Sequence, residues 1–157
     1  MHHFYPVFVE AECSRDAESI ALCLWSGVPE DCGWLWPPPR RMSWEKGIYW
    51  DYITTINKIA VLDKYLELAG VDPEDVKGLK RCERWDGFCV DFPKRVSELG
   101  LDVARAILIT ALERNALLLY YLDEDGHGTV EDEADKVWKI LKSRPDKIWV
   151  VWIDLHT

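Results

Sequence analysis

The sequence predicts a helix-rich α+β protein that folds as a single domain over residues 1–157. Both ends of the chain have the pattern of β-strands, and the residues between them carry apolar side chains at helical spacing. We therefore expect a small sheet that includes the N-terminal and C-terminal strands and is covered by helices. A chain in which 48% of 157 residues are apolar can bury a core of that size.

The two terminal strands are apolar on both faces. Residues 4–12 carry apolar side chains at odd and even positions, and residues 147–155 (KIWVVWIDL) are apolar at nearly every position. Strands of this kind are covered on both sides. Pro6 predicts an edge or a bulge in the first strand, because proline cannot donate to a sheet ladder. The pattern leaves open whether the two strands run parallel or antiparallel.

Four segments have the apolar periodicity of helices. The longest, residues 101–122, ends in a nearly continuous apolar run, so we expect a largely buried central helix there. The other three are residues 14–25, which begin at a serine suited to an N-cap, residues 45–69, which precede a glycine, and residues 130–141.

Two further segments are irregular or ambiguous. Residues 27–46 contain PPPRR and are expected to form an irregular connection. Residues 82–92 (CERWDGFCVDF) contain Asp-Gly between apolar runs, which favours either a two-residue hairpin or a helix–turn–helix. In that hairpin Cys82 would lie opposite Asp91 and not opposite Cys89. Because the sequence has no C-x-x-C, we expect its five cysteines to be buried free thiols.

Charge is concentrated in one part of the chain. Residues 123–135 contain seven acidic residues and no Lys or Arg, so removing these seven charges from the total of −9 leaves −2 for the rest. Nucleic-acid binding depends on Lys and Arg that neutralise phosphates, and the sequence has no basic stripe. We therefore expect no nucleic-acid partner. No run of 18 apolar residues occurs, so we expect no membrane span.

The composition resembles that of thermophilic proteins. The chain has no Gln, only two Asn and 30% charged residues, a pattern of many charges and few thermolabile amides. The first residues also lack the basic start of a secretory signal. We expect a cytoplasmic protein from a thermophile-like setting.

Residues 123–133 (DEDGHGTVEDE) resemble the first eight positions of an EF-hand calcium loop. By that resemblance, Asp123 and Asp125 supply carboxylate oxygens and Thr129 supplies a backbone carbonyl. Calcium prefers several hard oxygen ligands in a flexible ring, which clustered Asp residues on a turning loop can provide. The resemblance implies a weak divalent-cation site, for Ca²⁺ or Mg²⁺.

The loop departs from the EF-hand pattern at two positions. His127 stands where an oxygen ligand is usual, and Ala134 stands where a bidentate Glu should close the ring. Glu131 could replace that missing ligand. The alternative is a solvated connection between two elements, in which Asp and Gly are favoured for turn formation alone.

A second candidate site uses carboxylates at the strand ends. Glu10 and Glu12 end the first strand, and Asp154 ends the last. If those strands were parallel neighbours, the three carboxylates would converge and could hold Mg²⁺ for phosphoryl or phosphodiester chemistry. If they were antiparallel, the carboxylates would lie at opposite ends. This is the basis of an alternative function as a metal-dependent phosphoesterase or nuclease.

The main functional hypothesis is a non-enzymatic interaction or assembly protein, whose partner is a second copy of itself or another protein. The phosphate-loop, dinucleotide-binding, HExxH and nucleophile-elbow motifs are all missing from the sequence. Aromatic residues and Arg are enriched at protein interfaces. The candidate interaction surface therefore comprises Trp34, Trp36, Arg40, Arg41 and Trp44.

Overall fold

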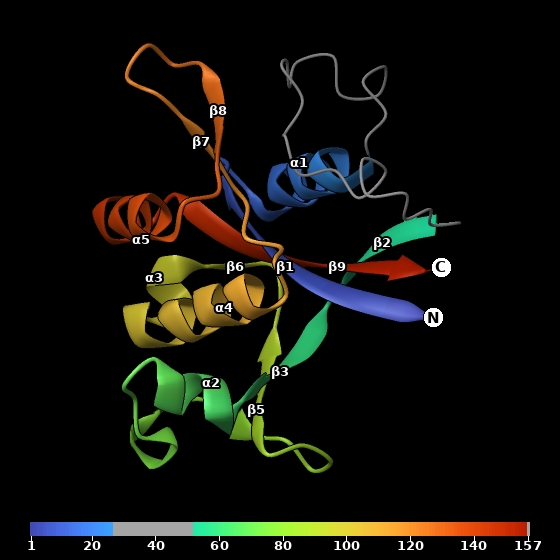
Figure 1. Ribbon diagram of the computed structural model, residues 1–157, viewed down its shortest axis with the longest axis vertical. Helices are drawn as coiled ribbons and strands as arrows, with labels where there is room; N and C mark the ends of the chain where they lie inside the picture. The colour runs from blue at the N-terminus through green and yellow to red at the C-terminus, as the bar shows by residue number, and fades with distance from the viewer. Residues whose placement is uncertain (27–51, 157) are drawn as a thin grey trace.

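The computed structural model describes residues 1–26 and 52–156, which form a mixed sheet with helices on both faces and a smaller sheet at one end (Figure 1). The strands are β1 (His2–Glu10), β2 (Tyr52–Ile56), β3 (Lys58–Leu62), β4 (Lys80–Arg81), β5 (Gly87–Asp91), β6 (Lys94–Arg95), β7 (Leu119–Leu122), β8 (Gly128–Glu131) and β9 (Ile148–His156). The helices are α1 (Ser14–Ser26), α2 (Asp63–Leu68), the 3-10 helix η2 (Pro73–Asp75), α3 (Val96–Leu99), α4 (Leu101–Glu113) and α5 (Ala134–Ser143).

This architecture corrects the expected helix-rich class. Helices make up 37% and strands 35% of the structure, which is a balanced α+β composition. Within the described residues, a six-stranded mixed sheet and a three-stranded sheet replace the small sheet that the sequence suggested. The expected sheet of terminal strands is present as the pair β1–β9, but it is the centre of a larger structure.

Two segments account for the error. The central helix expected over residues 101–122 ends at Glu113, because Asn115 adopts a left-handed backbone (φ 53°) that stops a helix. The apolar run beyond it forms β7 instead. In the helix expected over residues 45–69, the described part begins with β2 and β3. Their Ile, Thr and Val residues favour strands, and a short apolar run cannot distinguish the two by periodicity alone.

The main sheet has the strand order β2-β9-β1-β7-β8, and β6 also pairs with β9. β1 and β9 are antiparallel along their whole length, from His2 opposite His156 to Glu10 opposite Ile148. β1 is parallel to β7 over Phe8 and Val9 only. The outer edge of the first half of β1 is therefore unpaired by any strand of the described residues.

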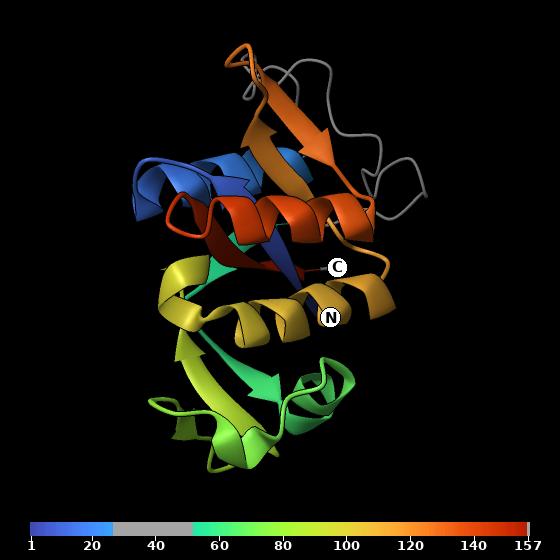
Figure 2. The same cartoon turned by 90° about the vertical axis from the view of Figure 1, so that its left-hand side faces the viewer.

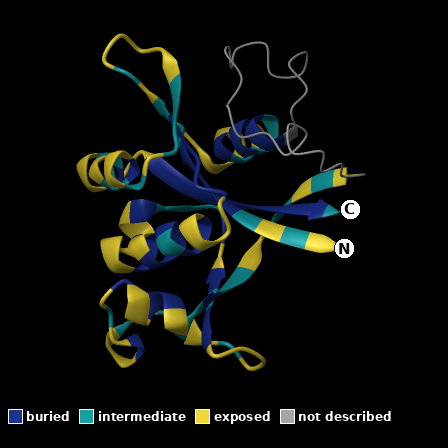
Figure 3. Cartoon of the chain, in the orientation of Figure 1, coloured by how far each residue is buried: buried dark blue, intermediate teal, exposed yellow. Residues whose placement is uncertain are grey.

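Side chains alternate between two cores on opposite faces of this sheet. Val7 and Val9 pack with α1 on one face, while Phe8 and Trp152 pack with α4 and neighbouring helices on the other. Figure 2 shows α4 and α5 side by side on the second face, and Figure 3 shows β9 buried along most of its length. β9 is consequently the central strand of the fold.

β2 and β6 occupy successive positions along the same edge of β9. Ile56, the last residue of β2, lies opposite Trp152, and Lys94, the first residue of β6, lies opposite Val150. Both run antiparallel to β9, so together they resemble one strand that is interrupted by residues 57–93. We call these residues the inserted ribbon. It carries β3, α2, η2, β4 and β5, and lies at the end of the molecule opposite the β7–β8 hairpin (Figure 1).

The inserted ribbon contains the second sheet, in the order β3-β5-β4. β4 and β5 form a hairpin with a connection longer than two residues, because Lys80 lies opposite Cys89. This register brings Cys82 beside Cys89, and the two form a disulfide. The expectation of buried free thiols is therefore wrong for this pair, and Cys13, which is a free thiol, is exposed.

Among the described residues, none of the helices combines the length and the apolar character needed to cross a bilayer.

We expect Gly87→Ala to destabilise the protein more than Gly128→Ala. A Cβ at residue 87 would lie 2.9 Å from Leu62 Cα and closer still to the Val61 carbonyl oxygen, both of which are backbone atoms. At residue 128 it would lie 2.6 Å from the Tyr120 hydroxyl, which belongs to a buried side chain but can shift more readily than backbone. Overpacking costs about 1–3 kcal/mol, and Gly87→Ala should reach the upper end. Urea unfolding of both variants measures the order, and a larger loss for Gly128→Ala would contradict it.

Candidate functional site: a groove beside the inserted ribbon

The best-formed candidate site is an apolar groove where the inserted ribbon meets the main body of the domain. It has a volume of about 380 Å³, which lies in the range of ligand-binding clefts. We call it the ribbon groove. Its base is β3, one wall is α4 with Phe4 of β1, and the other is the Cys82–Cys89 disulfide with Trp85. Trp85 is 65% exposed, so an aromatic surface is available to a ligand at this wall.

One edge of β3 runs along this groove. The Asn57 carbonyl accepts from the Phe92 N–H at an N···O distance of 2.8 Å, and the Asp63 N–H donates to the Asp86 carbonyl at 2.8 Å. In an antiparallel pair, alternate residues direct their backbone groups to the same partner. The backbone N–H and C=O groups of the intervening residues Lys58, Ala60 and Leu62 therefore point away from β5. No strand among the described residues pairs with this outer edge.

The charge of the ribbon groove differs from that of the whole protein. The chain carries −9, yet the only charged side chains among the described residues that line the groove are Lys58 and Arg114. Lys58 Nζ lies 3.8 Å from a carboxylate oxygen of Asp91, outside the groove lining. Arg114 donates to the Phe4 carbonyl and lies over the Trp152 ring, 5.9 Å from its centroid. The groove is thus an apolar channel with cationic groups at its rim.

The inner wall of the groove also holds an unsatisfied donor. Trp152 is only 2% exposed, and its indole N–H has no hydrogen-bond partner among the described residues. The ring lies against Phe92, with centroids 6.1 Å apart. A buried donor without an acceptor is costly, and because this nitrogen is closed to solvent it marks a cost within the core and not a contact for a ligand.

Glu10 has a structural role at the end of β1. One of its carboxylate oxygens accepts from the Leu122 backbone N–H and from Arg144 Nη1, each at 2.8 Å. Arg144 also donates to the Leu122 carbonyl at 2.8 Å. The two side chains therefore satisfy both backbone groups of Leu122 where the β1–β7 ladder has ended.

The three strand-end carboxylates do not converge. Because β1 and β9 are antiparallel, Asp154 lies opposite Phe4, six residues from Glu10, which is roughly 20 Å along a strand. Asp154 accepts instead from His2 Nδ1 at 2.8 Å. Glu12 shares a polar pocket with Glu10 at the other end of the strand pair. The geometry that a magnesium site at Glu10, Glu12 and Asp154 would require is not formed.

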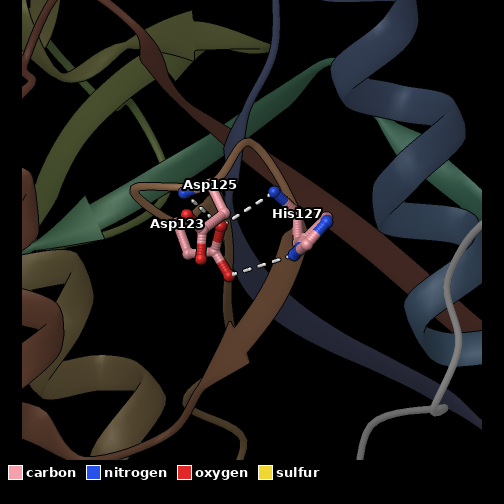
Figure 4. A group of neighbouring side chains, drawn as sticks. All are labelled: Asp123, Asp125 and His127. Carbon is pink, nitrogen blue, oxygen red and sulfur yellow. Dashed lines mark hydrogen bonds and ion pairs between the residues drawn. The ribbon is translucent and has the colours of Figure 1, made fainter.

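The acidic loop forms a β-hairpin turn between β7 and β8, and not the helix–loop–helix of an EF-hand. One Asp123 carboxylate oxygen accepts from the backbone N–H groups of Asp125 and His127, at 2.9 and 2.8 Å. Ligand atoms of these three residues lie within 4.8 Å of one another (Figure 4). Thr129 donates to the His127 carbonyl, and Glu131 lies farther along β8, 3.6 Å from Lys136 Nζ. The loop sequence is therefore explained first by turn formation.

The tryptophan-rich surface expected from the sequence cannot be placed. Trp34, Trp36, Arg40, Arg41 and Trp44 lie outside the described residues. The residues of the ribbon groove were missed by sequence reasoning, because they come from segments far apart in the chain. An exposed Trp85 next to a turn and an Arg at the end of an apolar helix were the available signals.

Tyr120 should contribute to a loss of stability at alkaline pH. Burial, and then the nearby charge of Glu10, raise its pKa above the usual value, which is about 10 in the unfolded chain. The stabilising contribution of the neutral phenol is complete below about pH 10 and is lost as the pH rises through the folded pKa. We expect the free energy of unfolding to fall more steeply above pH 10 in wild type than in Tyr120→Phe. Urea unfolding across this range, with pH 7 as reference, would contradict the prediction if the slopes were equal.

No family model, no curated protein and no solved structure gives a significant match to this chain. The function is therefore inferred from the residues and their geometry.

Proposed function

We propose that the domain is a non-enzymatic interaction protein that binds an extended segment of another polypeptide along the free edge of β3. The single observation that supports this function is the position of that edge: the outward backbone groups of Lys58, Ala60 and Leu62 lie along an apolar groove. Strand addition to an exposed sheet edge is a common way to recognise peptides, with main-chain hydrogen bonds for affinity and side-chain pockets for specificity.

The ribbon groove has surfaces for both sides of an added strand. Successive side chains of a strand point to opposite faces. One set would lie over Ala60, the Cys82–Cys89 disulfide and Trp85, and the other would face Ile107 and Thr110 of α4. A segment with apolar residues on both sides would therefore bury them while its backbone pairs with β3.

A second copy of the chain is one source of such a segment. Two β3 strands can pair antiparallel with Ala60 opposite Ala60, because the outward residues 58, 60 and 62 are placed symmetrically about that position. Sedimentation between 1 and 100 µM distinguishes self-association from binding to a different protein. A domain that binds only a different protein should sediment as a monomer at all of these concentrations.

We propose a cytoplasmic, thermophile-like setting for the protein. Its many charged residues and lack of Gln support this. The Cys82–Cys89 disulfide is compatible with it, because intracellular proteins of hyperthermophiles often contain disulfides.

Ala60→Pro should abolish segment binding while the domain remains folded. The Ala60 N–H points away from β5, so a proline removes an outward donor without breaking the β3–β5 ladder. Random decapeptides displayed on phage are the probe, with enrichment on immobilised wild type compared with the variant. Ala60→Val, which keeps the N–H, is the matched control. Equal enrichment of the same peptides on Ala60→Pro would contradict strand addition.

Backbone amide exchange, measured by NMR, checks the same edge independently. We expect the Ala60 amide to exchange rapidly in the free protein and the Val61 amide, which points to β5, to be protected. Bound peptide should then protect Ala60. Protection of Ala60 before peptide is added would mean that the edge is already occupied.

We further propose weak divalent-cation binding by Asp123, Asp125 and His127, supported by the proximity of their ligand atoms. A nitrogen ligand suits Zn²⁺ or Ni²⁺ better than Ca²⁺. Isothermal titration with each ion should show a stronger interaction for Zn²⁺, and Asp125→Asn should weaken it without loss of the Asp123 turn bonds. Equal heats in wild type and Asp125→Asn would contradict this site.

A further inference from the structure

We infer that the segment bound in the ribbon groove carries an acidic side chain, Asp or Glu, which pairs with Arg114 at one end of β3. This inference rests on the proposed function and adds the chemistry of the partner. The partner is a different protein with an extended, apolar and acidic segment.

Arg114 is exposed, and no carboxylate of the described residues forms an ion pair with it. Its hydrogen bond to the Phe4 carbonyl uses Nη1, which leaves other guanidinium N–H groups available. A guanidinium and a carboxylate make strong, often bidentate hydrogen bonds. Arg114 is not unusual in lacking an ion pair, since exposed Arg84 and Arg105 also form none with the described residues, but it is the one of these three that lines the apolar ribbon groove, where its free N–H groups can bind an anionic group of a ligand.

The cations occupy one end of the ribbon groove. Arg114 lies over Trp152, which is opposite Ile56 in the β2–β9 ladder, and Lys58 follows Ile56 by two residues. The other end lies near Leu62, opposite Gly87, beside the disulfide and Trp85. The groove therefore has its cations at one end only, which fixes the orientation of a segment with an acidic residue at one end and apolar residues beyond it.

A second copy of β3 does not satisfy this arrangement. In the symmetric pairing about Ala60, the partner strand KIAVL places Leu62 opposite Lys58. The partner's next residue, Asp63, falls opposite Asn57, but its carboxylate is already bonded to Arg81 of its own chain. Self-association therefore brings Arg114 no uncommitted carboxylate. Charge complementarity consequently favours a different, acidic partner.

The test starts from the phage-displayed decapeptides that are enriched on the immobilised wild-type protein. We expect them to share an Asp or Glu at one end of an apolar alternating stretch. A synthetic, fluorescein-labelled peptide of this set and its Glu→Gln (or Asp→Asn) analogue are then compared by fluorescence polarisation. The analogue should bind wild type about tenfold more weakly, the change expected for loss of one charge-assisted pair.

Arg114→Gln should bring the two peptides to within about twofold of each other, and Arg114→Lys should keep a preference for the acidic one. Arg105→Gln is the matched control, because Arg105 lies on the same helix, beside Trp138, and does not line the ribbon groove. It should behave like wild type. Thermal unfolding of each variant verifies that the domain is folded.

The outcomes distinguish a failure of the acidic-partner inference from a failure of strand addition. Enriched peptides without a shared acidic residue, or equal binding of the two synthetic peptides, would overturn the acidic partner while strand addition stands. An unchanged preference in Arg114→Gln would also overturn it. Enrichment that persists in Ala60→Pro, or no enrichment by wild type, would overturn strand addition itself, together with this inference.

Discussion

The fold depends on how the outer edge of β9 is shared between two short strands. β9 is buried along nearly all its length, and a buried strand needs partners for its backbone on both edges. β1 pairs with one edge, and β2 and β6 divide the other between Trp152 and Val150. Because the chain leaves this edge after Ile56 and returns at Lys94, the inserted ribbon must emerge at that point. Its position, and with it the ribbon groove, follows from the backbone requirement of one strand.

The outer edge of the first half of β1 also lacks a partner strand among the described residues, but its backbone groups are less available than those of β3. In β1, even-numbered residues point away from β9, as the bond from the Phe8 N–H to the Leu118 carbonyl shows. Pro6 falls in this set and has no N–H, and Arg114 occupies the carbonyl of Phe4. Exposed edges are commonly blocked in these ways, which prevents unwanted pairing. In β3, Lys58 is a charged residue of the kind that discourages pairing, but Ala60 and Leu62 have neither device, so this part of the edge remains competent for strand addition.

The sequence alone predicts the terminal strands, the edge character of Pro6 and most helix locations, because these follow from local periodicity and from single residues. It fails where an apolar run fits either a helix or a buried strand, as at residues 119–122, which form β7 after the left-handed Asn115 has ended α4. The candidate site is harder to predict. Arg114 and Ala60 line one groove only because β9 brings the ends of the inserted ribbon to α4 and β1, and no local pattern encodes that arrangement.

The contacts within the inserted ribbon affect the affinity of the β3 edge for a partner segment. The Cys82–Cys89 disulfide joins β4 to β5, and Arg81 bonds to Asp63 and Glu74 at 2.5 and 2.7 Å, which ties β4 to α2 and η2. Close backbone packing at Gly87 holds β5 against β3. Ordering a flexible edge on binding would reduce affinity, and an edge that is already ordered avoids this loss. The contacts that hold the ribbon together thus leave β3 as a preformed template, with its outward groups fixed before a partner arrives.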